Sequence, residues 1–350
     1  MRAIQISEFG GPDVLEVEEL DDPTAPEGFH LVAVSAAGVN FADTHQAENS
    51  YLAPSELPLV PGAEVVGTLE DGRRVVAILG SGGYAEKAVA HPSVMFDVPE
   101  GVSDGQALAI VLQGTTAWHL LRTSAQLRAG ESVVVFAAAG GTGTLAIQLA
   151  KRFGAGRVIG VASSDDKREL VERLGADATV DSRAEDLTAA IREANGGDRV
   201  DVVLEMVGGR SFEQALEAVA PFGRLVHFGQ AGREGAPKVD PGRLMGKSRG
   251  VIGFWLAHMM QRPDLMREAV EDQFAAVLAG ELEPIVGATY ALEDARRAHE
   301  DLRALHGRQA RPHPVAAQTA ARRASVVSRQ LSTSTGPRPG HSTKIRPCGS

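Results

Sequence analysis

Cysteine is almost missing from this chain, and its scarcity excludes several classes of protein. Cys348 is the only cysteine among 350 residues, so neither an internal disulfide nor a zinc site built on several cysteines can form. A reducing compartment, the cytoplasm, is therefore expected. Covalent catalysis also lacks a cysteine nucleophile, because the only cysteine lies in the C-terminal tail.

Long apolar runs are missing too. No apolar segment reaches the roughly 18 residues that a membrane-spanning helix needs. The opening residues, MRAIQISEFGG, alternate as a strand does and lack the apolar stretch of a signal peptide. We therefore expect no membrane partner and no secretion signal.

Acidic residues are missing from one part of the chain only. Residues 307–350 contain eight Lys or Arg and no Asp or Glu, whereas the whole chain has a formal net charge of −10, so residues 1–306 carry −18. Such an acidic body argues against nucleic acid as a partner. The tail, 307–350, is rich in Ser, Thr, Pro, Ala and Arg without apolar periodicity, and it is expected to be a disordered basic appendage.

The length and the periodicity of the rest indicate two domains. Residues 1–117 show short apolar runs broken by Gly, Pro and Asp, which predicts a β-rich module. Residues 118–256 alternate Val-, Ile- and Leu-rich strands with helices, which predicts an α/β fold with a doubly wound parallel sheet. Residues 257–306 contain two helical patterns and are expected to return to the first module.

A glycine-rich turn follows the first buried strand of this second region, in FAAAGGTGTLAIQLAKRFGA (136–155). It has the form A-x-G-x-x-G, a variant of the dinucleotide-binding fingerprint, between a strand and a helix. Glycines here let the backbone approach a pyrophosphate and let the helix pack closely, while the first helical N–H groups face the phosphate charge. The alternative is a tight turn with no ligand. The predicted contacts are Ala139, Gly140, Gly141, Thr142 and Gly143.

The end of the next strand, RVIGVAS, indicates which dinucleotide binds. NAD sites place an acidic residue there for the ribose hydroxyls, but this strand ends in Ala162, Ser163 and Ser164. The two serines offer hydroxyl groups and Lys167 offers a cation to a 2′-phosphate, so we expect NADPH. The alternative is that Ser164 is only a helix N-cap and Lys167 a solvated lysine.

Several further motifs, in this order and spacing, resemble those of one family. They are AAGVNFADTH (36–45), LPLVPGAEVVG (57–67), GGYAE (82–86), LQGTTAWHLL (112–121), AAAGGTGTLAIQLAK (137–151), VASSDDK (161–167), GRLVHFGQAG (223–232) and KSRGVIGF (247–254). Over about residues 1–305 the chain resembles the zinc-independent, quinone-oxidoreductase-like branch of the medium-chain dehydrogenase/reductase superfamily. The resemblance implies a GroES-like β-barrel catalytic domain beside a Rossmann domain, with the active site between them.

The resemblance also implies that no zinc is bound. Zinc alcohol dehydrogenases of this superfamily have a cysteine, a histidine and a cysteine where this chain has Asn40, Ala63 and Gln113. None of these three offers a thiolate or an imidazole. Alcohol oxidation without a Lewis acid is demanding, whereas a quinone or an enone accepts hydride readily and needs only hydrogen-bond donors for the charge that develops on oxygen.

The substrate side, as the resemblance implies it, comprises Asn40, Asp43, Tyr51 and Gln113. Asn40 and Tyr51 are expected to donate toward the acceptor oxygen or its bound water, and Asp43 to orient Asn40 or contact the nicotinamide ribose. Structural alternatives stay open: Tyr51 as a packing residue, Asp43 as a turn or cap residue, and Gln113 as a hydrogen-bonding residue at a helix end.

The resemblance assigns further cofactor contacts to Val207, Phe228, Gly229 and Phe254, the last with core packing as an alternative. Relatives often carry a tyrosine on the 2′-phosphate where this chain has Ser182 and Arg183. Arg183 can supply a charge-assisted hydrogen bond instead, or it is simply solvated.

Two expectations concern the end of the chain and its assembly. Relatives close the first module with a strand after the position of Leu305, but HGRQARPHPVAAQ shows none, so an unpaired sheet edge is expected. A homodimer is expected, with GVIGFWLAHMM (250–260) as its interface strand. The predicted function is NADPH-dependent reduction of quinones or enones; the alternatives are an enoyl thioester or 2-alkenal reductase, or an NADPH-binding protein without turnover.

Overall fold

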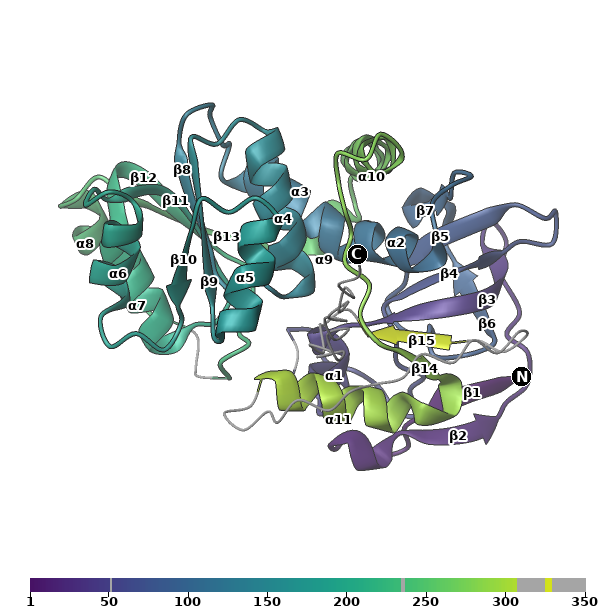
Figure 1. The fold of residues 1–350 in the computed structure, drawn as a ribbon. Helices are drawn as coiled ribbons and strands as arrows, with labels where there is room; N and C mark the ends of the chain where they lie inside the picture. The colour runs from purple at the N-terminus through teal and green to yellow at the C-terminus, as the bar shows by residue number, and fades with distance from the viewer. Residues whose placement is uncertain (51, 234–236, 307–324, 329–350) are drawn as a thin grey trace, which may run out of the picture.

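The chain forms two lobes that lie side by side (Figure 1). The computed structural model describes residues 1–50, 52–233, 237–306 and 325–328. One lobe is built on a parallel six-stranded sheet, and the other on a curled, mostly antiparallel sheet. The predicted fold class, a doubly wound α/β sheet beside a GroES-like β-barrel, is confirmed.

The parallel sheet has the strand order β10-β9-β8-β11-β12-β13. The chain starts at the central strand β8, winds outward to β10, and then crosses back to β11. The crevice that binds dinucleotides in such sheets lies at the carboxyl ends of β8 and β11, where the winding direction reverses. The strands are β8 (Ser132–Val135), β9 (Arg157–Ala162), β10 (Ala178–Asp181), β11 (Val200–Glu205), β12 (Val219–His227) and β13 (Gly250–Gly253).

Helices cover both faces of this sheet, and the central strands are therefore continuous runs of buried Val, Ile and Leu. Figure 1 shows α4 and α5 on one face and α6 and α7 on the other. Their bounds are α4 (Gly141–Arg152), α5 (Asp165–Arg173), α6 (Leu187–Ala194) and α7 (Gly209–Ala218).

The antiparallel sheet has the order β14-β15-β3-β4-β5-β7, and β6 also pairs with β3. A separate hairpin-like pair, β1 (Arg2–Gln5) and β2 (Glu16–Glu19), lies beside it. The strands of the larger sheet are β3 (His30–Val39), β4 (Glu64–Thr68), β5 (Arg74–Ile78), β6 (Lys87–Ala90), β7 (Met95–Asp97), β14 (Thr289–Ala291) and β15 (Ser325–Ser328).

Strand β15 corrects the prediction of an unpaired sheet edge, and it differs from the predicted disordered tail over residues 325–328. Ser325–Ser328 pairs in parallel with 36–39 of β3 and antiparallel with β14. The composition of 307–350 concealed this strand, because four residues of strand pattern are few among the basic and polar residues around them. The backbone groups at the end of β3 need partners, and this segment supplies them. The rest of the predicted tail lies outside the described residues.

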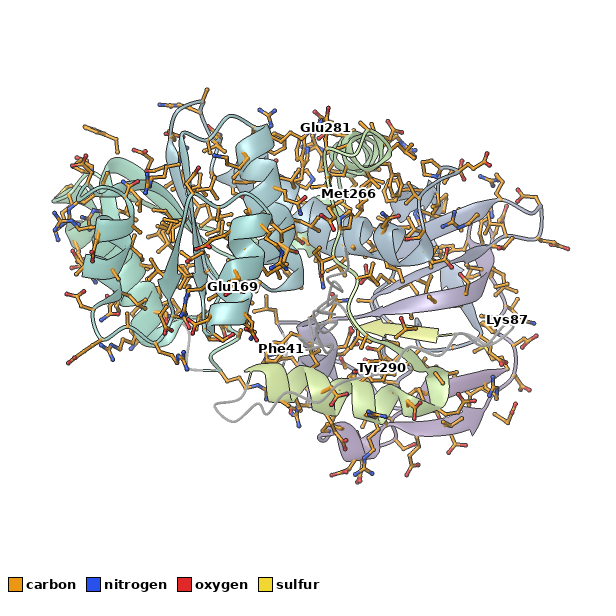
Figure 2. The ribbon with its side chains drawn as sticks, in the orientation of Figure 1. Phe41, Lys87, Glu169, Met266, Glu281 and Tyr290 are labelled. Atoms are coloured by element: carbon orange, nitrogen blue, oxygen red, sulfur yellow. The ribbon has the colours of Figure 1, made fainter. Side chains whose placement is uncertain are left out.

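The segment after β13 packs on both lobes. Met266 of α10 (Pro263–Leu278), labelled in Figure 2, is fully buried in a cluster with Val66 and Val76 of the antiparallel sheet. Ala269 of the same helix belongs to a cluster that contains Val133 of β8. Helix α11 (Ala295–His306) packs on the core of the first lobe. The predicted domain boundaries stay a prediction.

The connection between the lobes is helical and irregular. It contains α2 (Asp104–Leu108), a π-helical turn at Ala109–Gly114, α3 (Thr115–His119) and a second π-helical turn at Leu120–Ser124. No helix in the described part of the chain has the length and hydropathy to span a membrane. The remaining helices are α1 (Phe41–Ala47), α8 (Pro241–Met245) and α9 (Leu256–Met259), with short 3-10 turns at Pro12–Val14, Pro92–Val94 and Leu292–Asp294.

Candidate active site

Asn40 is the N-cap of α1, and its side-chain amide is held at both ends. Its Nδ2 donates to Oε1 of Glu64 at 3.0 Å, and its Oδ1 accepts from Nε2 of Gln113 at 2.9 Å. Asn40 and Glu64 are both buried. The amide plane therefore has a defined direction, since a reversed amide would place its oxygen against the Glu64 carboxylate.

Gln113 links the two lobes at this point. It lies on the first π-helical turn, a type of distortion that often occurs at functional sites. Its Oε1 is buried and has no hydrogen-bond partner among the described residues. A Cβ placed on Gly141 would lie only 1.7 Å from this oxygen. The substrate-side amides therefore adjoin the glycine turn at the start of α4.

Asp43 holds the main chain of Asn40. One carboxylate oxygen, Oδ2, accepts the Asn40 N–H at 2.7 Å and the Tyr84 hydroxyl at 3.0 Å. Asp43 is thus the N3 residue of a helix cap, which agrees with the alternative prediction that it is a turn or cap residue. The same contact orients Asn40. Tyr51 lies outside the described residues, and its role stays a prediction.

Three buried residues of this site were not predicted as members of it: Glu64, Tyr84 and His299. The Tyr84 hydroxyl lies 3.1 Å from Nε2 of His299. Burial, with Asp43 and Glu64 nearby, raises the pKa of Tyr84, and burial lowers the pKa of His299 to about 4. Two of the three stood in quoted motifs, PGAEVVG and GGYAE. Their contacts span up to 215 positions, so no local spacing reveals them.

The glycine turn has the backbone geometry that a pyrophosphate site needs. Gly140 is the N-cap of α4, and its N–H donates to the carbonyl of Ala137 at 2.8 Å. A Cβ on Gly143 would lie 2.3 Å from that same carbonyl oxygen, so only glycine allows the helix to approach the turn. The first N–H groups of the helix, from Gly141 and Thr142 onward, have no intrahelical acceptors. They therefore suit an anion.

Cations gather where β9 and β10 end. Lys167 lies 3.5 Å from the Ser163 hydroxyl, and burial lowers its pKa. Arg183 hydrogen-bonds to Asp181 through its guanidinium. Arg168, which was not predicted, donates to the Ala162 carbonyl at 3.3 Å and lies 3.4 Å from Asp181.

Ser164 occupies the N-cap position of α5, as the structural alternative proposed, but its side chain makes no capping hydrogen bond. Its hydroxyl, that of Ser163 and the nearby cations together fit a phosphate monoester.

Glu205 shapes the loop after β11. Its Oε1 accepts the N–H groups of Val207 and Gly208 at 2.7 and 2.9 Å, and its Oε2 lies 2.8 Å from Nδ1 of His227. The N–H of Phe228 donates to the Glu205 carbonyl. Val207 and Phe228, both predicted cofactor contacts, therefore lie together at the carboxyl ends of β11 and β12. Glu205 itself was not predicted.

Phe254 and Gly229 complete this edge of the sheet. The Phe254 N–H donates to the His227 carbonyl at 2.9 Å, and the Phe254 ring stacks on His119 with centroids 6.4 Å apart. A Cβ on Gly229 would lie 3.2 Å from Cβ of Met206. The structure thus places Phe254 at the edge of the parallel sheet and in contact with the core.

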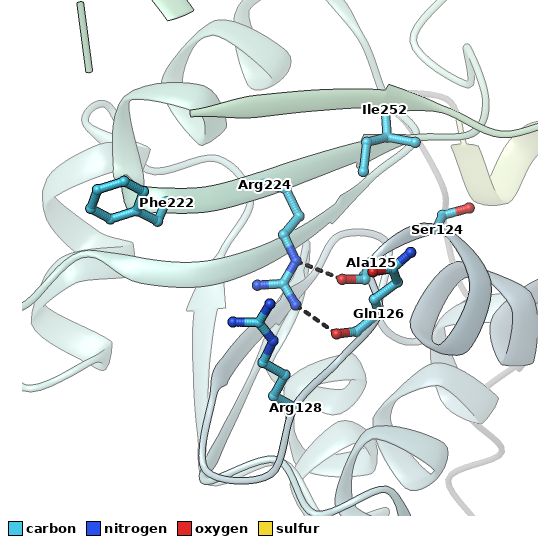
Figure 3. Close-up of a pocket in the computed structure, with 7 residues that line it drawn as sticks. All are labelled: Ser124, Ala125, Gln126, Arg128, Phe222, Arg224 and Ile252. Carbon is cyan, nitrogen blue, oxygen red and sulfur yellow. Dashed lines mark hydrogen bonds between the residues drawn. The ribbon is translucent and has the colours of Figure 1, made fainter. Parts of the chain in front are cut away.

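A surface cavity of about 240 Å³ lies elsewhere on the parallel sheet (Figure 3). Arg224 crosses it and donates to the carbonyls of Ala125 and Gln126. Phe222 and Arg128 lie at its margin. Its lining comes from residues 124–128, which precede β8, from Phe222 and Arg224 of β12 and from Ile252 of β13, and it includes no residue of the glycine turn and none around Asn40. It is not the candidate active site.

Comparisons with known proteins show which proteins this chain is similar to. Residues 141–272 match the family described as zinc-binding dehydrogenase. The quinone oxidoreductase of Pseudomonas aeruginosa is 34% identical over 316 residues, which cover 87% of this chain and 96% of that protein. Among solved structures, the quinone oxidoreductase of Thermus thermophilus, also solved with NADPH, is 34% identical with a TM-score of 0.79, covering 94% of this chain and 100% of that one. The Escherichia coli quinone oxidoreductase complexed with NADPH is 29% identical with a TM-score of 0.81, covering 94% and 99%.

The residues of this site do not fit a zinc ion, despite the name of the matched family. Asn40 and Gln113 carry neutral amides that are bonded to each other, and Ala63 has no ligand atom. No group of three or more His, Cys, Asp or Glu side chains suited to a metal occurs within residues 1–50, 52–233, 237–306 and 325–328. The side-chain amides of this site suit hydrogen bonding rather than the coordination of zinc.

Proposed function

The chain belongs to the quinone-oxidoreductase-like branch of the medium-chain dehydrogenase/reductase superfamily, and on that premise we propose that it is an NADPH-dependent, metal-free reductase of quinones or related electrophilic enones. One observation carries the proposal: Gln113 contacts both Asn40 and Gly141. The residues expected to meet the acceptor thus adjoin the turn expected to bind the dinucleotide. Hydride transfer requires such proximity.

The described residues fit NADPH. The N–H groups in the first turn of α4, which follow Gly140 in the sequence, would hold the pyrophosphate. Ser163, Ser164, Lys167 and Arg183 would hold the 2′-phosphate, with Arg168 as an additional cation. Val207, Phe228, Gly229 and Phe254 would border the nicotinamide. The bound dinucleotide supplies hydride, while the protein orients the reactants and excludes water.

Asn40 supplies hydrogen-bond donation to the acceptor. Its Nδ2 carries two N–H groups and gives one to Glu64, so the second can point to a carbonyl oxygen of the acceptor. That oxygen would gain negative charge when the conjugated carbon accepts hydride. A fixed donor in a buried site stabilises such charge without reorganisation. Gln113 keeps the Asn40 amide directed, and Tyr51 is the second proposed donor.

A second copy of the chain is the proposed partner in assembly, through the side of β13 that pairs with no other strand in the described part of the chain. The predicted interface strand is shorter than expected, because only Gly250–Gly253 is a strand and Leu256–Met259 forms helix α9. β13 is the last strand of its sheet, and an edge strand exposes backbone groups that can pair. Phe222 is 86% exposed at the neighbouring cavity (Figure 3).

We place the enzyme in the cytoplasm, as its single cysteine indicates.

Loss of NADPH absorbance in the presence of different acceptors tests the proposed function. Benzoquinone and naphthoquinone should be reduced rapidly, crotonaldehyde more slowly, and a simple alcohol should not be oxidised by NADP. Turnover should survive treatment with a strong chelator. Faster reduction of crotonaldehyde or an enoyl thioester would favour the double-bond reductase, and NADPH binding without turnover would favour the silent binding protein.

A further inference from the structure

A chain of hydrogen bonds between buried side chains leads from helix α11 to the N-cap of α1. His299, Tyr84 and Asp43 are 1%, 0% and 1% exposed. The Tyr84 hydroxyl lies 3.1 Å from Nε2 of His299 and 3.0 Å from Oδ2 of Asp43, which accepts the Asn40 N–H at 2.7 Å. These hydrogen bonds thus connect α11, which follows the parallel sheet in sequence, to Asn40, the residue proposed to meet the acceptor.

The hydrogen bonds of this chain run in one direction while Asp43 is ionised. A carboxylate only accepts, so Tyr84 donates its single hydroxyl proton to Asp43. The Tyr84 oxygen then accepts from His299, which requires a neutral imidazole with its proton on Nε2. Burial lowers the pKa of His299 to about 4, so the ring is neutral at pH 7. Every donor in the chain therefore has one acceptor.

We propose that Tyr84 and His299 are positioning residues that hold Asn40 in the direction needed to meet the acceptor. The inference rests on the proposed reductase function. Asp43 fixes the Asn40 main chain, and Tyr84 fixes the carboxylate of Asp43. Without that support the carboxylate can rotate and the helix cap can open, and the Asn40 amide then leaves Glu64 and Gln113. A buried network in which each donor has an acceptor is rigid, which suits a supporting role.

Tyr84 is itself fixed by the main chain around it. Its N–H donates to the Pro61 carbonyl at 2.9 Å, and its carbonyl accepts from Ile4 at 2.8 Å. Gly62, at φ +103°, lies against the ring, where a Cβ would be 2.6 Å from Cδ1. The phenol therefore cannot swing away. The hydroxyl is the part of Tyr84 that acts on Asp43.

Tyr84→Phe removes this hydroxyl and keeps the ring. We expect kcat with a quinone to fall about tenfold, which corresponds to the loss of one modest interaction in the transition state. The dissociation constant of NADPH should change less than about twofold, because the proposed nucleotide site lies on the other lobe. Tyr290→Phe is the matched control: Tyr290 belongs to the same hydrophobic cluster, and its hydroxyl donates to Asp301 at 2.8 Å, outside the chain. Its kcat should stay close to that of wild type.

Two variants of His299 separate positioning from packing. Glutamine can donate an N–H to Tyr84, whereas leucine cannot. We expect His299→Gln to keep most of the activity and His299→Leu to match Tyr84→Phe. Equal activity of the two His299 variants would overturn the proposal. So would a Tyr84→Phe enzyme whose kcat falls no further than that of Tyr290→Phe.

Nitrogen NMR of the His299 imidazole gives a readout that does not depend on turnover. At pH 7 the proton should be on Nε2, and this state should be disturbed in Tyr84→Phe but not in Tyr290→Phe. A proton on Nδ1 with a bare Nε2 would overturn the proposed direction of the chain. A wild-type protein that reduces no quinone would overturn the proposed function instead, and the imidazole signal distinguishes these two failures.

Discussion

Gln113 donates from Nε2 to Oδ1 of Asn40 across 2.9 Å, although 73 positions separate the two residues. The other end of the same amide lies against Gly141, the first residue of α4. One side chain thus contacts both the proposed acceptor site and the proposed nucleotide site.

Asn40→Ala should reduce kcat with a quinone by about 10²-fold, which is the usual effect of removing one fixed donor to a developing oxyanion. NADPH affinity should be nearly unchanged. Steady-state kinetics and a fluorescence titration with NADPH check both expectations. Asn195→Ala, on the parallel-sheet lobe where Asn195 donates to the Arg199 carbonyl, is the control. A kcat within threefold of wild type would count against Asn40 as a donor to the acceptor.

Gly143→Ala should destabilise the parallel-sheet lobe by roughly 1–3 kcal/mol, as overpacking does. Its Cβ would lie 2.3 Å from the Ala137 carbonyl oxygen and 2.7 Å from Cα of Ala138, both of which belong to the main chain. Gly246→Ala is the control, because Gly246 is helical in conformation and its Cβ would be 3.4 Å from the nearest carbonyl oxygen. Urea denaturation compares the two. Equal stability of both variants would contradict the packing argument.

Lys167→Ala and Arg168→Ala should each lower the preference for NADPH over NADH by about tenfold, since each removes a cation proposed to make a charge-assisted contact with the 2′-phosphate. Titrations with both nucleotides measure the ratio of dissociation constants. Lys151→Ala removes a lysine of the same lobe that pairs with Asp177 at 2.9 Å, and it should leave the ratio unchanged. A preference that survives the loss of both cations would refute the proposed phosphate site.

Stability should fall as the pH drops from about 6.5 to about 4, because burial lowers the pKa of His299 from 6.5 to about 4. The unfolded chain binds this proton in that window and the folded chain does not, so acid favours unfolding. The contribution is on the order of 3 kcal/mol, from about 1.4 kcal/mol per pKa unit.

Thermal melts of wild type and His299→Gln across this range test the effect of His299. The variant should show a shallower dependence on pH. His119, whose pKa burial also lowers to about 4, still contributes in both proteins. Identical pH slopes for wild type and variant would show that His299 does not bind the extra proton on unfolding.

Phe222→Lys should weaken the proposed homodimer, because it places a charge beside the edge strand β13. Leu278→Lys is the control: Leu278 is also exposed, but it lies at the end of α10. Sedimentation velocity over a range of concentrations measures the dissociation constant, and a rise of at least tenfold is expected for the Phe222 variant alone. A wild-type protein that stays monomeric at all concentrations would contradict the proposed assembly.

The sequence alone determined the class of the fold and the position of the glycine turn. Strands with continuous Val, Ile and Leu alternating with helices require cover on both faces, and a parallel sheet is the structure that provides it. The glycines at 140, 141 and 143 follow a buried strand, so their place at the start of α4 was predictable. These features depend on local periodicity and on steric rules that act over a few residues.

Only the tertiary structure decided how the site is held together. Glu64 reaches Asn40, and Tyr84 lies between Asp43 and His299, because the antiparallel sheet curls and α11 returns to it. No pattern along the chain encodes those distances. The closing strand Ser325–Ser328 was missed for the same reason: four residues have a weak preference of their own, and the free backbone groups of β3 make them a strand. Long-range hydrogen bonds form where the fold brings donors and acceptors together, and composition does not predict which distant residues come into contact.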